Sequence, residues 1–252
     1  MSTEKIFFVQ GDSPAMMEAY QKAQKTFKYF WRELSWEYRR IVPALDVACV
    51  KAVFMQEAGP DTPPITENMW LNNIGFDGEY IYGVLVNTPN ELTNIENGAE
   101  VKLSIDQISD WLFVNQGITY GGFTIHAIRS DMNEEERAAH DAAWGLDFGD
   151  SNDIMIVYQE KEHPENLEEH PMSKNMREKV VAHLQQNPAE VNAADENGYT
   201  LLHKETIAGN RTFVEELLAA GADTSLKTKN GKTALDFAKQ LNWEHIIPLL
   251  EK

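Results

Sequence analysis

Cysteine is almost absent from this sequence, since Cys49 is the one thiol among 252 residues. A single cysteine cannot form a disulfide within the chain, and its place in the apolar run VACV favours a buried, inert thiol over a nucleophile. Long apolar runs are missing as well, so a membrane-spanning helix is not expected. The first residues, MSTEKIFFVQGDSP, are too short and too acidic for a signal peptide, and we expect a cytoplasmic protein.

Basic residues are scarce, and most of the imbalance falls in one segment. The chain has 22 Lys and Arg residues against 40 Asp and Glu residues, a formal charge of -18. Residues 131–172 alone hold 13 acidic and 2 basic side chains. Such a field repels nucleic-acid phosphates and anionic lipids, so we expect neither nucleic acid nor membrane as a partner. A protein with a basic surface fits the charge better.

The motifs of common enzyme classes are also absent. The sequence has no cysteine pair, no His-Glu-x-x-His, no glycine-rich phosphate loop before a helix and no Gly-x-Ser-x-Gly elbow. His126 and His140 could join nearby carboxylates around a metal, but their spacing does not show converging ligands. We therefore predict no catalytic residue, no metal and no cofactor, and favour a protein that is not an enzyme.

A 33-residue repeat occupies the last part of the chain. The same offset relates Gly198 to Gly231 and Leu217 to Leu250. This period and the run ENGYTLLHKETIAGN resemble the ankyrin repeat, present twice in full after a half-repeat. The resemblance implies a protein-binding surface on turn and helix positions, although a merely solvated loop is the alternative. The positions predicted to contact a partner are Glu196, Asn197, Tyr199, Ile207, Lys229, Asn230, Lys232 and Gln240.

The first full repeat departs from the ankyrin pattern at Glu205, where ankyrin helices normally carry a small, packed alanine. A carboxylate in a tight helix interface is costly unless it is paired. We therefore expect an arginine of the N-terminal helix, Arg32, Arg39 or Arg40, to hold Glu205 within the chain. Because so few repeats bury little surface by themselves, the N-terminal region is also expected to shield them.

The N-terminal region combines one long helix with short β-rich runs. After Pro14, apolar residues recur at three- and four-residue steps up to Ile41, which predicts a helix with a core-facing stripe. Turn sequences at Asp77-Gly78 and at residues 115–117 predict hairpins between strands. The run ITYGGFTIHAI, residues 118–128, is interpreted as one of these strands. Short connections between successive strands imply an antiparallel, curled sheet in an α+β domain.

This region also resembles a known family. The runs ENMWLNNIGFDGEYIYGVLVN, ISDWLFV and YGGFTI, followed by a glutamate-rich helix, are similar to the bacterial YegJ-like domain of unknown function over about residues 14–150. The resemblance implies a fold and very little chemistry. The predicted organisation is an α+β domain at residues 1–158 with the N-terminal helix packed on the sheet, an acidic connector at 159–172, and an all-α ankyrin-repeat segment at 173–252.

Two functions are compatible with these features. The first is a cytoplasmic protein-binding protein of adaptor or toxin-neutralising type that acts by occluding a surface; the toxin-neutralising version rests on analogy of class alone. The alternative is an enzyme or small-ligand-binding protein with a pocket around Trp70, Asn87, Asp110 and Trp111. In that pocket the Asp110 carboxylate would accept a bond from a ligand while the Trp111 indole stacks on it. We favour the plainer interpretation, a turn-forming carboxylate beside a core anchor.

Overall fold

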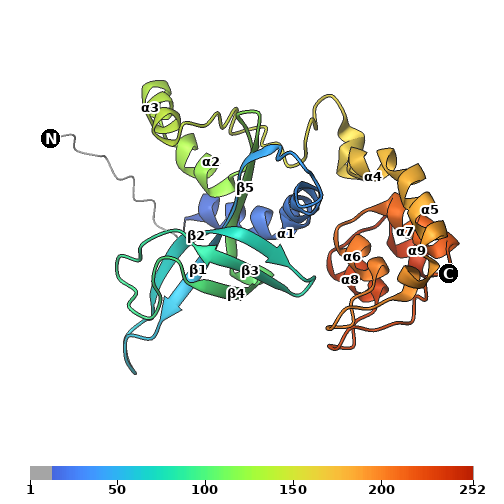
Figure 1. Ribbon diagram of the computed structural model, residues 1–252. Helices are drawn as coiled ribbons and strands as arrows, with labels where there is room; N and C mark the ends of the chain where they lie inside the picture. The colour runs from blue at the N-terminus through green and yellow to red at the C-terminus, as the bar shows by residue number, and fades with distance from the viewer. Residues whose placement is uncertain (1–12, 252) are drawn as a thin grey trace. The chain divides into compact units, whose positions relative to one another are not determined.

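The computed structural model describes residues 13–251, which form two compact units (Figure 1). The first unit comprises Val42–Tyr158 together with the described residues up to Phe30. The second comprises Trp31–Ile41 together with Gln159 onward. Helix α1, Pro14–Glu37, therefore contributes residues to both units. The first unit contains the sheet, and the second is built from helices, so the α+β prediction is confirmed.

Six antiparallel strands form the sheet of the first unit, in the order β4-β3-β2-β1-β5-β6 (Figure 1). Strands β1 to β4 follow one another as a meander, and β5 returns to pair with β1. Val50 of β1 is thus paired in register with Leu71 of β2 on one side and with Trp111 of β5 on the other. The strands are β1 Leu45–Gln56, β2 Ile65–Phe76, β3 Tyr80–Leu85, β4 Glu100–Ser104, β5 Ile108–Asn115 and β6 Ile118–Gly121.

Both predicted hairpins are confirmed. The carboxylate of Asp77 accepts bonds from the amides of Glu79 and Tyr80 at 2.8 and 2.7 Å, which closes the turn between β2 and β3. Between β5 and β6, Gln116 and Gly117 both have positive φ, 51° and 79°. A two-residue turn with positive φ at both positions matches the twist of the strands that it joins. Local turn chemistry therefore set the register of these two hairpins.

The first part of α1 packs on one face of the sheet. The Ser13 hydroxyl accepts a bond from the Met16 amide at 3.2 Å, as expected at a helix start. Ala23 and Phe27 on this helix are buried, and the Trp111 indole donates to the Ala23 carbonyl at 3.0 Å. The predicted stripe is wrong at Ile41, because the helix ends at Glu37 and Ile41 is fully exposed.

Residues 118–128 do not form the single strand that was predicted. Strand β6 ends at Gly121, and helix α2, Phe123–Ser130, begins after Gly122. The two glycines have φ of 75° and 73°, and a Cβ on Gly121 would lie 2.5 Å from ring atoms of Trp111. The alternation of apolar and polar residues gave a wrong prediction here, because a left-handed turn at the glycine pair ends the strand and starts a helix directly. The close backbone approach suggested by adjacent glycines is present.

Helix α3, Glu134–Trp144, follows α2 on the other face of the sheet. The Asn133 side chain accepts from the Glu136 amide, and the Glu136 carboxylate accepts from the Asn133 amide, which forms a capping box. Ile125 of α2 and Phe148 pack against Leu112 and Val114 of β5. The sheet of the first unit is therefore covered on both faces.

The second unit shows the repeat in three dimensions. Thr200 and Thr233, 33 residues apart, cap their helices in the same way, each accepting a bond from the amide three residues later. Val214 and Phe237 pack fully buried in its core. The helical segments are η2 Pro164–Leu167, α4 Pro171–Asn175, α5 Arg177–Gln186, η3 Pro188–Asn192, α6 Leu201–Ile207, α7 Arg211–Ala219, α8 Ala234–Gln240 and α9 Ile247–Leu250; η1, Ile105–Gln107, belongs to the first unit.

The acidic segment 159–172 is more than the solvated connector that was predicted. Asn166, Glu169 and His170 are 6%, 3% and 4% exposed. The Glu169 carboxylate accepts bonds from the Ser173 hydroxyl and from the amide and hydroxyl of Thr212. Charge was a poor guide here because a carboxylate with several donors can be buried without a large penalty.

The repeats should fail to fold without these contacts. We predict that residues 173–252 expressed alone remain mostly unfolded, because the fragment lacks Trp31–Ile41 and residues 159–172, which pack against it. Repeat arrays are stabilised mainly by neighbouring interfaces, and this one would lose one of them. Circular dichroism during heating measures the outcome. A cooperative melt of the fragment near the midpoint of the whole chain would contradict the prediction.

Candidate protein-binding surface

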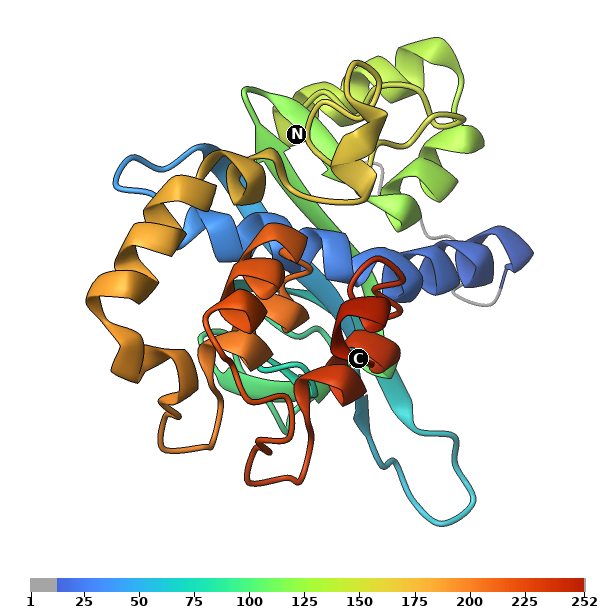
Figure 2. The same ribbon diagram turned by 90° about the vertical axis from the view of Figure 1, so that its right-hand side faces the viewer.

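Two turns project side by side from one end of the repeats (Figure 2). They contain residues 195–200 and 228–233. The Asp195 carboxylate accepts bonds from the amides of Asn197 and Tyr199, both at 3.0 Å, which shapes the first turn. The Lys229 amide donates to the Asn197 carbonyl at 2.9 Å and ties the second turn to the first. The two turns therefore present a single, ordered surface.

Most of the residues predicted to contact a partner lie at these turns or beside them. Tyr199 and Lys232 are half-buried, and the Tyr199 ring stacks on Phe237 with centroids 5.9 Å apart. Ile207 is only 3% exposed, so its prediction as a contact residue was wrong. It faces the helical core because it occupies the inward side of α6. The exposed members of the predicted set are Glu196, Asn197, Lys229, Asn230 and Gln240.

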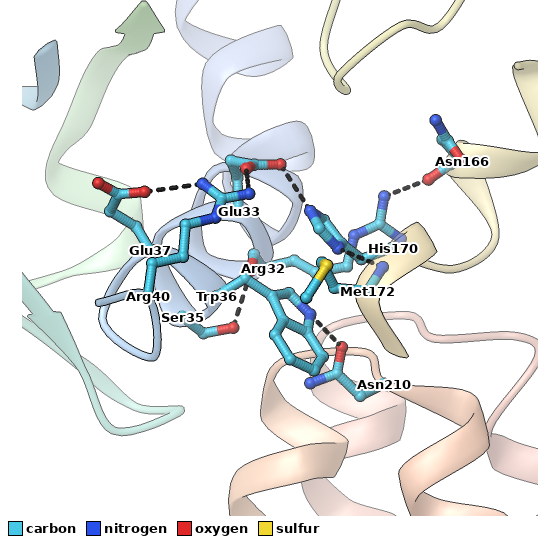
Figure 3. A network of polar contacts seen from close by, with 10 residues as sticks. All are labelled: Arg32, Glu33, Ser35, Trp36, Glu37, Arg40, Asn166, His170, Met172 and Asn210. Atoms are coloured by element: carbon cyan, nitrogen blue, oxygen red, sulfur yellow. Dashed lines mark hydrogen bonds and ion pairs between the residues drawn. The ribbon is translucent and has the colours of Figure 1, made fainter. Parts of the chain in front are cut away.

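Elsewhere in the second unit, the segment Trp31–Ile41 lies against the repeats. The Trp36 side chain is buried and donates its indole N–H to the Asn210 side chain at 2.9 Å (Figure 3). Its ring stacks on His170 at 5.6 Å between centroids and meets Phe213 edge-on at 5.5 Å. Trp36 is thus a buried anchor between α1 and the repeats.

Glu205 is held by Arg39, as predicted. The guanidinium reaches both carboxylate oxygens, at 3.0 and 3.3 Å, and the Asn210 amide donates to one of them at 2.8 Å. The Glu205 side chain is 7% exposed, whereas that of Arg39 is 34% exposed. The Arg39 guanidinium also lies 4.6 Å above the Trp36 ring. Asn210 therefore links the ion pair to the tryptophan anchor.

A second buried carboxylate, Glu33, joins the same segment to α4. The Met172 amide donates to Nδ1 of His170, so the ring proton is on Nε2, which donates to Glu33 at 3.0 Å (Figure 3). Arg40 lies 3.2 Å from Glu33 on the other side. Burial alone would raise the pKa of Glu33, but the bond from His170 and the charges of Arg40 and Arg32 hold it below its usual value.

Because the pKa of Glu33 is lowered, the stability of the fold depends on pH in a defined direction. An acid whose pKa is lower in the folded state stabilises the fold above its unfolded pKa, and this contribution is lost as pH falls through the folded value.

Arg32 meanwhile donates to the carbonyls of Asn166 and Leu167 and lies 5.6 Å from the Trp243 ring. Arg32, Arg39 and Arg40 therefore bind different groups, and of the three it is Arg39 that pairs with Glu205.

Asp110, the polar centre of the alternative pocket, acts as a helix cap. It is completely buried and accepts bonds from the amides of Trp111, Phe123 and Thr124 at 2.8–2.9 Å, and from the Thr124 hydroxyl. Burial raises the pKa of Asp110, although these bonds and the charge of Lys51 oppose the rise. The carboxylate therefore fixes the first turn of α2, where N–H groups lack helical acceptors.

The other three residues of that pocket are divided between the faces of the sheet. Successive side chains of a strand alternate, so Trp111 lies opposite to Asp110 and is itself buried against α1. Trp70 shares the face of Asp110, with Lys51 of β1 between them. Asn87 accepts a bond from the Trp70 amide at 2.6 Å. A ligand site at these residues stays a prediction, but the chain itself uses the acceptors of Asp110 and Asn87.

Residues 13–251 contain neither a cluster of metal-ligating side chains nor a helix suited to cross a membrane. Within that range no three side chains of His, Cys, Asp or Glu gather as metal ligands would. No helix in the same range has the length and apolar character that a membrane span needs.

Comparison with known families agrees with this architecture. Residues 13–148 match the family described as "Uncharacterized protein conserved in bacteria (DUF2314)", and residues 184–238 match "Ankyrin repeats (many copies)". The chain belongs to the DUF2314 family. The DUF2314 domain corresponds to the sheet with α1, α2 and α3, and the ankyrin match covers α6 and α7 and much of α8. Ankyrin repeats indicate interaction with another protein.

Individual proteins are similar to all or part of this chain. An ankyrin repeat protein of Neisseria meningitidis serogroup B is 52% identical over 251 residues, which is 100% of this chain and 98% of the relative. The protein YegJ of Escherichia coli is 35% identical over 71 residues, 28% of this chain and 46% of YegJ. Mouse oxysterol-binding protein-related protein 1 is 41% identical over 61 residues, 24% of this chain and 6% of that protein. The Neisseria meningitidis protein thus matches this chain over its whole length.

Replacing Glu205 should show how much its pair contributes. We predict that Glu205→Ala lowers the free energy of unfolding by about 3 kcal/mol, because the buried Asn210 amide loses its acceptor and the partly exposed Arg39 loses its pair. Glu215→Ala is the matched control, since Glu215 pairs with Arg211 at 2.8 Å within α7, where both side chains reach solvent. The control should cost well under about 1 kcal/mol. Denaturant melts measure both, and equal stability of Glu205→Ala and wild type would rule out a stabilising pair.

Proposed function

We propose that this protein binds another protein through the two repeat turns and acts by occluding a surface of that partner, as an adaptor or as a neutraliser of a toxin. The observation that carries the proposal is the division of contacts within the second unit. Trp36 and Arg39 meet the repeats at Glu205, Asn210 and Phe213, near the loop that joins α6 to α7. The turns at residues 195–200 and 228–233 keep exposed side chains.

The chemistry of the turns supports this role. Asp195 and the bond between Lys229 and Asn197 order the backbone before any partner arrives. An ordered surface loses less conformational entropy on binding than a mobile loop does. The exposed side chains of the turns include a negative charge on Glu196, a positive charge on Lys229 and an amide on Asn197. These groups can form directional contacts at the edge of the surface. These features favour protein recognition over a solvated loop.

A basic partner surface and a cytoplasmic location belong to the same proposal. The acidic segment 131–172 supplies the negative charge that would attract such a partner. Glu169 of this segment is buried and contributes little to that attraction. Glu162, Glu165 and Glu168 are exposed in the second unit. Charges at such positions speed the approach of an oppositely charged partner more than they strengthen the final complex.

The enzyme or ligand-binding alternative at Trp70, Asn87, Asp110 and Trp111 is less well supported. The carboxylate of Asp110 already accepts bonds from three amides and a hydroxyl of the chain. A ligand would have to displace a helix cap in order to use it.

Reversing two charges at the turns should weaken partner binding. We predict that Glu196→Lys combined with Lys229→Glu reduces recovery of the partner by about tenfold, equal to roughly 1.4 kcal/mol. Glu178→Lys combined with Lys179→Glu is the matched control, because these residues are exposed on α5 of the same unit. Affinity purification from the native cell with quantitative mass spectrometry measures recovery. If control and turn variants lose the same proteins equally, the turns are not the binding surface.

The association rate with that partner should depend on salt. We expect the rate to fall steeply as ionic strength rises while dissociation changes little, since screening weakens long-range attraction. Reversing Glu162, Glu165 and Glu168 should slow association without lowering the melting temperature, because all three are exposed. Stopped-flow measurements across a salt series give both rates. A salt-insensitive association rate would remove the acidic segment from the binding mechanism.

A further inference from the structure

The two edges of the sheet in the first unit differ in what covers them. At β6 the Thr119 amide donates to the Asp147 carbonyl at 3.1 Å. The Gly121 amide donates to the Met155 carbonyl at 2.9 Å, so the loop after α3 covers this edge. The opposite edge is β4, which pairs with β3 alone among the described strands (Figure 1). An uncovered edge is a template on which another strand can pair.

Alternate residues of β4 turn their backbone groups away from the sheet. The Leu85 amide donates to the Ala99 carbonyl at 2.9 Å, which fixes the phase of the ladder between β3 and β4. Because backbone groups alternate in direction along a strand, Val101 turns toward β3, and its neighbours Glu100 and Lys102 turn outward. No residue in the described part of the chain forms a hydrogen bond with these outward N–H and C=O groups. Both residues are exposed, so another strand can reach them.

The side chain of Lys102 does not close this edge. A lysine on an edge strand normally discourages pairing. Here its ammonium nitrogen lies 3.8 Å from the centre of the Tyr80 ring and 5.6 Å from that of the Tyr82 ring, both on β3. The side chain is therefore drawn back over the sheet, and the backbone of β4 stays accessible.

The charges of β4 favour one particular pairing of two copies. An isologous pair of antiparallel strands repeats each contact about its twofold axis. With Val101 on that axis, Glu100 of one copy lies directly opposite Lys102 of the other, and the same pair recurs on the far side of the axis. A register centred on Glu100 or on Lys102 instead places like charges opposite each other, which destabilises a sheet.

We propose that the edge of β4 joins this protein to a second copy of itself, with Val101 opposite Val101 and each Glu100 opposite a Lys102. Opposed residues exchange the backbone bonds that β4 leaves unused, and the two six-stranded sheets become one continuous sheet. Glu100 and Lys102 lie on the same face, where their ion pairs form across the axis. The pairing strip is short, so the association belongs to the weak, reversible class. This surface lies in the first unit, and the repeat turns lie in the second.

Sedimentation velocity of the full chain over a concentration series, at about 0.15 M ionic strength, tests the proposal. The wild-type mass should rise from that of one 28.6 kDa chain toward twice that value. Glu100→Lys and Lys102→Glu should each weaken association by about tenfold, because each variant places like charges opposite each other. An equal mixture of the two variants should associate as wild type does, because every opposed pair then has opposite charges.

Glu57→Lys is the matched control for the effect of net charge. It makes the same charge change at an exposed residue just after β1, and β2 and β3 separate that strand from β4. The chain has a formal charge of -18, so added positive charge lowers the general repulsion between copies. Glu57→Lys should therefore associate at least as well as wild type. Net charge alone predicts the same of Glu100→Lys, so weaker association of that variant reports the pairing at β4.

Each outcome decides the proposal. A mass that stays that of one chain over the whole series overturns it. Association of either single variant that equals wild type also overturns it, because the contact then lies elsewhere, and so does a mixture that associates no better than each variant alone. Association that is lost in both single variants and recovered in their mixture supports it. Recovery in the mixture also shows that both variants are folded.

Discussion

A short repeat array has too few neighbours to bury its own helices, and the second unit meets this constraint with residues from elsewhere in the chain. Trp36 supplies an apolar ring, a ring stack and an indole donor, while Arg39 supplies the charge that Glu205 needs. Glu169 and His170 complete the cover from the acidic segment. Because Trp36 lies in α1 and Arg39 follows directly after that helix, the repeats cannot form their full set of contacts without this part of the chain.

The departure from the ankyrin pattern at Glu205 follows from this arrangement. An alanine there would pack against neighbouring helices but could not pair with Arg39. The carboxylate instead holds a guanidinium that also lies over Trp36, and Asn210 bonds to both Glu205 and Trp36. Such a linked set is more selective than apolar packing, since each member left unpaired would be a buried polar group with a cost of its own. The position thus specifies which segment covers the repeats.

The success of sequence-based prediction varied with the range of the interactions. The turns at Asp77 and Gln116 depend on their own residues, so they could be predicted, as could the 33-residue period. The strand expected at residues 118–128 was wrong, because the turn at Gly121 depends on contacts with Trp111 and Asp110 from another strand. The partner of Glu205 was narrowed to three arginines because an unpaired carboxylate was implausible. The contacts of Arg129 with Gly149 and Asp141 had no sequence signal, since they join three separate segments.

The acidic segment shows why net charge is an incomplete guide to a surface. Its 13 carboxylates include Glu136 in a helix cap, Asp141 on Arg129, and Glu169 buried beneath Thr212. These groups satisfy donors inside the fold and contribute little to attraction at a distance. The charge available for a partner is therefore smaller than the sequence total and is concentrated in exposed residues such as Glu162 and Glu168.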